Sequence, residues 1–92
     1  MQITFRYTSQ LATAAGAAEE MVEVQNGSSL VDLLRDLAAK HDTDFSKFVV
    51  DKDGNVAPTL VVAVNGSQVS FEELVSLDKD SEVMLITPMS GG

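Results

Sequence analysis

The 92-residue sequence predicts an α+β domain in which a mixed, mainly antiparallel sheet packs against one helix. Three observations predict it. Two short strand-like segments open the chain, one amphipathic helix follows them, and two apolar segments come after the helix. Because the first two strands are close in sequence, we expect them to pair antiparallel. The strongly apolar last strand is expected to lie centrally, beside the first.

The first segment reads MQITFRYT and alternates in polarity. Ile3, Phe5 and Tyr7 fall on one face and polar side chains on the other, a pattern typical of a half-buried strand. The next stretch, SQLATAAGAA, is rich in small residues, so we expect a loop with at most one helical turn. EEMVEVQ then predicts a second short strand, which an Asn-Gly pair ends.

The clearest helix is expected to begin at Ser29 and to end near His41. Ser29 stands three residues before Asp32, a spacing typical of a helix N-cap. Four leucines at i, i+3, i+4 and i+7 form its apolar stripe: Leu30, Leu33, Leu34 and Leu37. This stripe predicts that the helix fills the core against one face of the sheet.

The stretch FSKFVVDKDGNVAP leaves two local structures open. Phe45 and Phe48 could continue a helix, whereas Asp53 and Gly54 form a turn signal and Pro58 ends whatever precedes it. Next, TLVVAVNG is almost continuously apolar, which predicts a strand buried on both faces.

A short paired segment is expected at residues 68–69, and one helical turn around residues 71–74. The last strand, EVMLIT, alternates again. Val83 and Leu85 should face the helix, together with the first strand. Met84 and Ile86 should project from the opposite face, where we expect them to form a partner-docking patch ringed by acidic side chains.

Composition excludes several classes of function. The chain has 14 acidic and 6 basic residues and a net charge of −8, which disfavours nucleic acid and anionic membranes and suits a basic protein partner. It has no cysteine, which excludes disulfides, thiolate metal sites and a cysteine nucleophile. The sequence shows no membrane-length apolar run and no secretory signal, so a cytoplasmic location is expected.

The remaining candidate sites are weak. Asp51–Asn55 (DKDGN) does not place carboxylates where a calcium loop needs them, so a turn is expected. His41 lies near a helix end and has no titratable partner at a suitable spacing in the sequence. The carboxylates of Asp78, Asp80 and Glu82 are typical of a solvated corner. We therefore expect no catalytic residues and no metal site.

The ending PMSGG is the most informative feature. Pro88 ends strand pairing and sets an exit direction, so we divide the chain into a domain, residues 1–88, and a flexible tail, residues 89–92. Glycine has no Cβ, so Gly91 and Gly92 can thread a narrow channel and present an unhindered carboxylate to another protein's active site. A terminus with no purpose is the alternative.

Several features together resemble the MoaD/ThiS family of sulfur carriers, to which the small subunit of molybdopterin synthase belongs. They are the element order, the VAVNGSQVSFEE run, the DSEVMLITPMSGG ending and the length. The resemblance covers essentially the whole chain. It implies a ubiquitin-like β-grasp fold, with a mixed sheet of four to five strands on one main helix and a Gly-Gly tail. It also implies a carrier that is not itself an enzyme.

The resemblance implies roles for single residues. Gly92 matches the glycine that is adenylated and then thiocarboxylated, and Gly91 and Ser90 match the part of the tail that threads into the partner. Ile86 matches a position in the last strand that is aromatic in the molybdopterin branch and contacts the partner. That branch ends its strand in a Phe-Phe-Pro-Pro-like run, whereas this chain has LITP.

Partners and pathway follow from the same resemblance. The expected partners are an adenylyltransferase related to ubiquitin-activating enzymes, which uses ATP, and a sulfur acceptor such as the molybdopterin synthase large subunit. No cofactor is expected to be bound stably, and the free protein should be a monomer. Molybdenum cofactor, thiamine, cysteine and tRNA thiolation pathways stay open. The alternatives are a ubiquitin-like modifier conjugated to lysines through Gly92 and a binding module with an accidental Gly-Gly.

Overall fold

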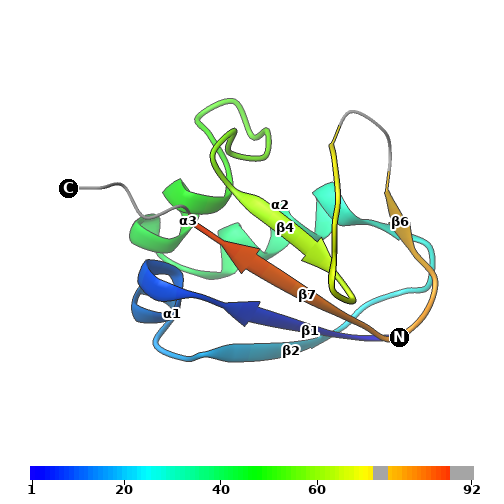
Figure 1. Ribbon diagram of the computed structural model, residues 1–92. Coiled ribbons are helices and arrows are strands. Elements are labelled where there is room, and N and C mark those ends of the chain that lie inside the picture. Colours follow the sequence, from blue (N-terminus) through cyan, green and yellow to red (C-terminus); the bar gives the residue numbers. More distant parts are fainter. Residues whose placement is uncertain (72–74, 88–92) are drawn as a thin grey trace.

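Five strands form one sheet in the order β2-β1-β7-β4-β5, and helix α2 lies across one of its faces (Figure 1). The computed structural model describes residues 1–71 and 75–87. The predicted α+β class, with a mixed sheet on one main helix, is confirmed. Within the described residues, no helix combines the length and the apolar content that crossing a membrane requires.

The strand pairing follows the prediction closely. β1 (Gln2–Tyr7) pairs antiparallel with β2 (Glu19–Glu23) and parallel with β7 (Ser81–Ile86). β7 also pairs antiparallel with β4 (Val61–Val64), whose other neighbour is β5 (Ser67–Gln68). The last strand is therefore central and lies beside the first, as expected.

The core lies between this sheet and α2 (Leu30–Lys40). Alternation directs every second residue of β1 and β7 towards the helix, and the four leucines of α2 meet them. Leu34 and Val83 are fully buried, and the exposed fraction of Phe5 is 1%. The buried residues contributed by these three elements are Ile3, Phe5, Tyr7, Leu30, Leu33, Leu34, Leu37, Ala38, Val83 and Leu85.

The start of α2 differs in one detail from the prediction. Ser29 is the N-cap residue, but its side chain makes no capping hydrogen bond. The backbone N–H of Leu30 instead donates to the carbonyl of Val75 (2.8 Å). Because β3 (Ser28–Ser29) pairs with β6 (Ser76–Leu77) in a second small sheet, a neighbouring segment provides the acceptor for this N–H of the first turn.

The alanine-rich stretch is a helix rather than a loop. α1 (Ser9–Ala15) runs for two turns, although at most one turn was expected. Alanine has the highest intrinsic helix propensity, and the fully buried Leu11 anchors the helix to the core. Gly16, interpreted as a break, is its left-handed C-cap (φ 75°), and its N–H donates to the carbonyls of Ala12 and Thr13.

The ambiguous middle segment contains both a helix and a turn. α3 (Thr43–Val49) begins after Asp42, whose side chain accepts a hydrogen bond from the N–H of Phe45 (3.4 Å). Phe45 and Val49, four residues apart, are both fully buried. The expected turn follows, where Gly54 adopts φ 82°.

β4 is not buried on both faces, because only Val62 is buried and its neighbours are half-buried. The cause is that α2 covers one face of the sheet only, so the other side of β4 stays partly exposed. The helical turn expected around residues 71–74 falls mostly outside the described residues, and the paired segment near residue 68 is β5.

Candidate docking face and chain terminus

The tail departs from the end of the central strand. Thr87, the last described residue, is 8% exposed and follows β7 directly. The hydroxyl of Thr8 donates to the carbonyl of Leu85 (3.2 Å), which ties the end of β7 to the start of α1. The core and this hydrogen bond thus fix the end of β7, from which the chain continues into Pro88. Ser90, Gly91 and Gly92, and the expected flexibility of residues 89–92, lie outside the described residues.

Met84 and Ile86 lie on the sheet face opposite α2, which we call the open face. Both are half-buried, whereas Val83 and Leu85 between them are fully buried on the other side. In the register with β4, Met84 is paired with Ala63 and Ile86 with Val61. These four residues, Val61, Ala63, Met84 and Ile86, form an apolar strip across two neighbouring strands.

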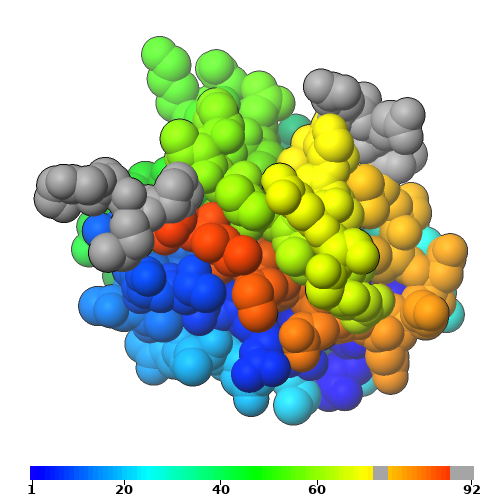
Figure 2. Space-filling model, in the orientation of Figure 1, coloured from blue at the N-terminus to red at the C-terminus, as the bar shows by residue number. Residues whose placement is uncertain are grey.

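Figure 2 looks onto the open face. β7 (orange to red) runs between β1 (dark blue) and β4 (yellow-green). In the same orientation, Figure 1 shows α2 behind the sheet. No described helix lies over β7 or β4 in this view. The apolar side chains of the strip are therefore half-buried without a covering helix.

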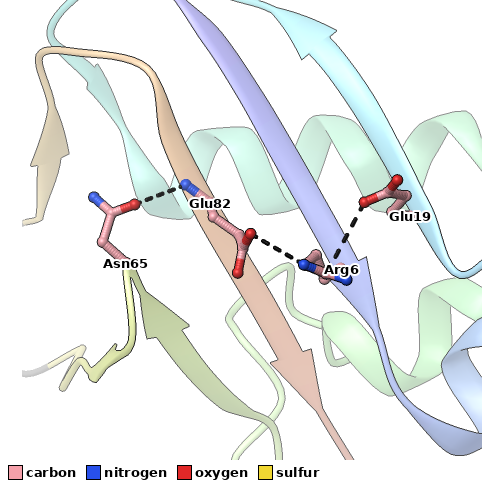
Figure 3. Close-up of polar contacts among 4 residues, drawn as sticks. All are labelled: Arg6, Glu19, Asn65 and Glu82. Carbon is pink, nitrogen blue, oxygen red and sulfur yellow. Dashed lines mark hydrogen bonds and ion pairs between the residues drawn. The ribbon is translucent and has the colours of Figure 1, made fainter.

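A charged row crosses the open face next to the strip (Figure 3). Arg6 of β1 lies opposite Met84 in the parallel register. Its Nη1 is 3.3 Å from Oε2 of Glu82, and its Nε is 4.0 Å from Oε2 of Glu19. The partners are about half exposed, so each pair contributes at most about 1 kcal/mol. The row therefore acts mainly as a polar border to the strip.

Asn65 anchors the turn after β4 to this border. Its side-chain Oδ1 accepts a hydrogen bond from the N–H of Glu82 (2.9 Å), and its own N–H donates to the Glu82 carbonyl (2.8 Å). Asn65 adopts a left-handed conformation (φ 49°), which asparagine tolerates better than most residues. The Asn-Gly turn thus fixes both the end of β4 and the position of Glu82.

The expected acidic ring is only partly present. Glu19 and Glu82 lie on the open face next to the strip. Arg6 lies between them and compensates one of the two negative charges. The alternation in MQITFRYT already placed Arg6 on the outer face. Its two carboxylate partners could not be identified from the sequence, since they depend on pairing with strands that lie 13 and 76 residues away.

His41 has a titratable partner, contrary to expectation. Its Nε2 lies 2.7 Å from Oε1 of Glu20, which also accepts a hydrogen bond from the Tyr7 hydroxyl (2.7 Å). Lys40 Nζ is 2.6 Å from the other oxygen of this carboxylate. The His41 ring also packs on Phe45, with centroids 4.2 Å apart. The sequence did not reveal this cluster because Glu20 approaches α2 only through the β1–β2 pairing.

These contacts shift the pKa values of Glu20 and Tyr7. Burial opposes ionisation of Glu20, but the hydrogen bonds from Lys40, Tyr7 and His41 outweigh it and lower the pKa of Glu20 to about 2. Burial, with the bond to Glu20, raises the pKa of Tyr7 far above its ordinary value. The Glu20 carboxylate therefore stays ionised and is hydrogen-bonded or ion-paired through both of its oxygens. This arrangement indicates a structural role, in which Glu20 joins the sheet to the end of α2.

The carboxylates of Asp51 and Asp80, two other candidates, accept hydrogen bonds from backbone N–H groups. The Asp51 carboxylate accepts hydrogen bonds from the N–H groups of Asp53 and Asn55, which makes DKDGN a side-chain-stabilised turn. Asp80 accepts a hydrogen bond from the Gln2 N–H (2.7 Å) at an exposed corner. Among residues 1–71 and 75–87, no group of three or more acidic, histidine or cysteine side chains could hold a metal ion.

Comparison with known proteins extends these observations. A family model described as the ThiS family matches residues 5–92. The molybdopterin synthase sulfur carrier subunit of Chlamydomonas reinhardtii is 32% identical over 92 residues, which cover 100% of both chains.

Solved structures share the fold. Small archaeal modifier protein 1 (SAMP1) of Haloferax volcanii is 25% identical, with a TM-score of 0.83 over 100% of both chains. A complex of subunits 1 and 2 of the molybdopterin-converting factor of Helicobacter pylori contains a chain that is 12% identical, with a TM-score of 0.62 over 100% of both chains. The expected ubiquitin-like β-grasp fold is thereby confirmed.

Proposed function

The chain belongs to the ThiS family of small sulfur carriers, and we propose that it carries sulfur for a molybdopterin synthase as a thiocarboxylate on Gly92. The observation that carries this proposal is the end-to-end match, at 32% identity, with a molybdopterin synthase sulfur carrier subunit. The family consists of small carrier subunits rather than catalytic enzymes. This agrees with the prediction that the chain is not an enzyme.

The proposed chemistry takes place at the terminal carboxylate. An oxygen of the Gly92 carboxylate attacks the α-phosphorus of ATP in the adenylyltransferase partner, which forms an acyl-adenylate and releases pyrophosphate. A sulfur nucleophile then attacks the acyl carbon, and AMP leaves with that oxygen, so a C–S bond replaces a C–O bond. This chain has no cysteine, so the sulfur atom resides on Gly92 itself. ATP and the sulfur donor belong to the partners, and no cofactor is held stably.

The geometry of β7 supports this role. The same strand carries Met84 and Ile86 on the open face and leads directly into the tail. The five residues after Thr87 span at most about 18 Å when extended. A partner that covers the apolar strip can therefore receive Gly92 only in an active site within that distance of the end of β7. The strip supplies affinity, and the tail supplies the reacting group.

The proposed partners are two proteins that use the same face in turn. The first is an adenylyltransferase related to ubiquitin-activating enzymes, and the second is the large subunit of a molybdopterin synthase. The pairing of subunits 1 and 2 in the Helicobacter pylori complex supports the second. We place the free protein in the cytoplasm as a monomer, with no nucleic acid or membrane partner, consistent with its charge of −8.

The likeness to SAMP1 favours a second function. A small modifier has the same fold at 25% identity over the whole chain, and conjugation to lysines through Gly92 would begin with the same adenylation. The two functions differ only in the nucleophile that attacks the activated carbonyl. A sulfur nucleophile gives a thiocarboxylate, whereas a lysine amine gives an isopeptide bond.

Intact-mass measurement separates these functions. The protein is incubated with its adenylyltransferase, ATP and a sulfide donor, and the same reaction without ATP is the control. A sulfur carrier gains the mass difference between sulfur and oxygen at Gly92. A molybdopterin synthase large subunit that is supplied with its sulfur-accepting substrate then reverses that gain, because the sulfur is transferred to the substrate. A modifier gives conjugates of higher mass on target lysines. An unchanged mass with an active adenylyltransferase contradicts both functions.

A further inference from the structure

β2 is one edge of the five-stranded sheet, and no described strand pairs with its outer side. Val24 and Met1 exchange two backbone hydrogen bonds, of 2.9 and 2.8 Å. Bonded and non-bonded pairs alternate along an antiparallel ladder, so Val22 also directs its N–H and C=O towards β1. The residues whose backbone groups point away from the sheet are Glu19, Met21 and Glu23. This edge can accept a further strand.

A cleft of about 200 Å³ lies between this edge and α2. Val22 and Val24 line its β2 side, and Leu33 and Leu37 line its α2 side. In a strand added beside β2, the side chain next to Val22 points to the same face as Val22, and therefore towards this cleft. The free backbone edge and the cleft thus suit the same ligand, an extended peptide with an apolar residue at that position.

The charges around the edge determine which peptide fits. Glu19 and Glu23 are exposed on either side of Met21, and the exposed Asp36 borders the cleft. No ion pair in the described part of the chain involves Glu23 or Asp36, whereas the nearby Lys40 is paired with Glu20 at 2.6 Å. A second copy of β2 would place glutamates opposite glutamates, which is unfavourable. A strand with lysines or arginines at those positions would be attracted.

We propose that the β2 edge binds an extended basic segment of a partner protein, which adds to the sheet beside β2. Alternate apolar residues of that segment enter the cleft between β2 and α2, and the basic residues between them lie next to Glu19 and Glu23. The inference does not rest on the sulfur-carrier proposal. β1 separates β2 from β7, so this surface is distinct from the apolar strip and from the end of β7.

The test uses the full chain and a seven-residue capped peptide that alternates lysine and valine. Backbone amide shifts in two-dimensional NMR should move at Met21, Glu23 and the cleft residues during titration. A peptide that alternates lysine and serine has the same charge without apolar side chains, and should bind at least tenfold more weakly. A peptide that alternates glutamate and valine should produce no shifts there.

Two variants of the exposed Met21 isolate the backbone contribution. Met21→Pro removes the outward N–H, and proline is tolerated at a sheet edge, so affinity for the lysine–valine peptide should fall at least tenfold. Met21→Thr keeps that N–H and should bind like the parent chain. If Met21→Pro does not fold, the double variant Glu23→Lys, Asp36→Lys changes only exposed side chains and should weaken binding by a similar factor.

Several results would overturn the proposal. Equal affinity for the lysine–serine peptide would mean that charge alone attracts the ligand. Shifts confined to the open face, or full binding by a folded Met21→Pro variant and by the charge-reversed variant, would exclude strand addition at β2. Shifts at Met21 and Glu23 that depend on protein concentration without peptide would show that a second copy occupies the edge.

Discussion

At the scale of single residues, Glu20 links the sheet to the end of α2 through three side-chain partners. Its side chain is 20% exposed and its carboxylate contacts Tyr7, Lys40 and His41. The pKa of Glu20 in the folded protein, about 2, lies below its ordinary value of 4.5. The ionised form is therefore favoured by folding, and its contribution to stability is present above about pH 4.5 and is lost as the pH falls towards 2.

The substitution Glu20→Gln should therefore destabilise the protein in a pH-dependent manner. At pH 7 we expect the free energy of unfolding to fall by about 2–3 kcal/mol. The difference between the parent and the variant should shrink as the pH decreases from 5 to 2. Urea denaturation of both proteins at a series of pH values measures it. A difference that is the same at pH 7 and pH 3 would contradict the role assigned to the ionised carboxylate.

A substitution at Ile86 tests whether the apolar strip binds a partner. Ile86→Asp places a charge on the open face and should weaken binding to the adenylyltransferase or the synthase large subunit at least tenfold, about 1.4 kcal/mol. Because Ile86 is only half-buried, unfolding should remain cooperative. Gln68→Asp adds the same charge at the far edge of the same face and is the matched control. Titration calorimetry and thermal unfolding measure both effects, and an Ile86→Asp variant that unfolds would assign this residue to the core.

At the scale of elements, α2 and the strand pair β1–β7 carry the fold together. Leu34 is fully buried between them, so Leu34→Ala removes packing that the surroundings cannot replace. We expect a loss in the order of 2–5 kcal/mol in the free energy of unfolding. Asp36→Ala on the exposed side of the same helix should change it by less than about 0.5 kcal/mol. A loss for Leu34→Ala as small as that of Asp36→Ala would contradict the placement of α2 on the sheet.

At the scale of the whole molecule, the described core and the proposed reaction involve different parts of the chain. The core lies between the sheet and α2, whereas the reaction is proposed at Gly92, outside the described residues. Deleting Gly91 and Gly92 should therefore leave the melting temperature within about 2 °C of the parent value and abolish thiocarboxylation. Adding one residue after Gly92 should abolish it equally, since the carboxylate is displaced. Calorimetry and intact mass measure the two properties, and thiocarboxylation of the shortened chain would contradict the assignment.

Much of the fold could be predicted because it depends on local periodicity. The alternation of Ile3, Phe5 and Tyr7 and the leucine spacing from Leu30 to Leu37 each define a buried face without any knowledge of what packs on it. Antiparallel pairing of β1 with β2 followed from their proximity along the chain. α1 was missed because the many small residues and Gly16 suggested a loop, although alanine propensity and one apolar anchor, Leu11, were sufficient for a helix.

The sequence by itself determined the α+β class, the core faces and the family, and it predicted a reactive terminus at Gly92. Only the tertiary structure decided which side chains meet across strands. Arg6 between Glu19 and Glu82, and Glu20 against Tyr7, Lys40 and His41, depend on the register of strands that are distant in sequence. The physical reason is that periodicity is a property of one segment, whereas an ion pair or a free sheet edge is a property of two segments brought together by folding.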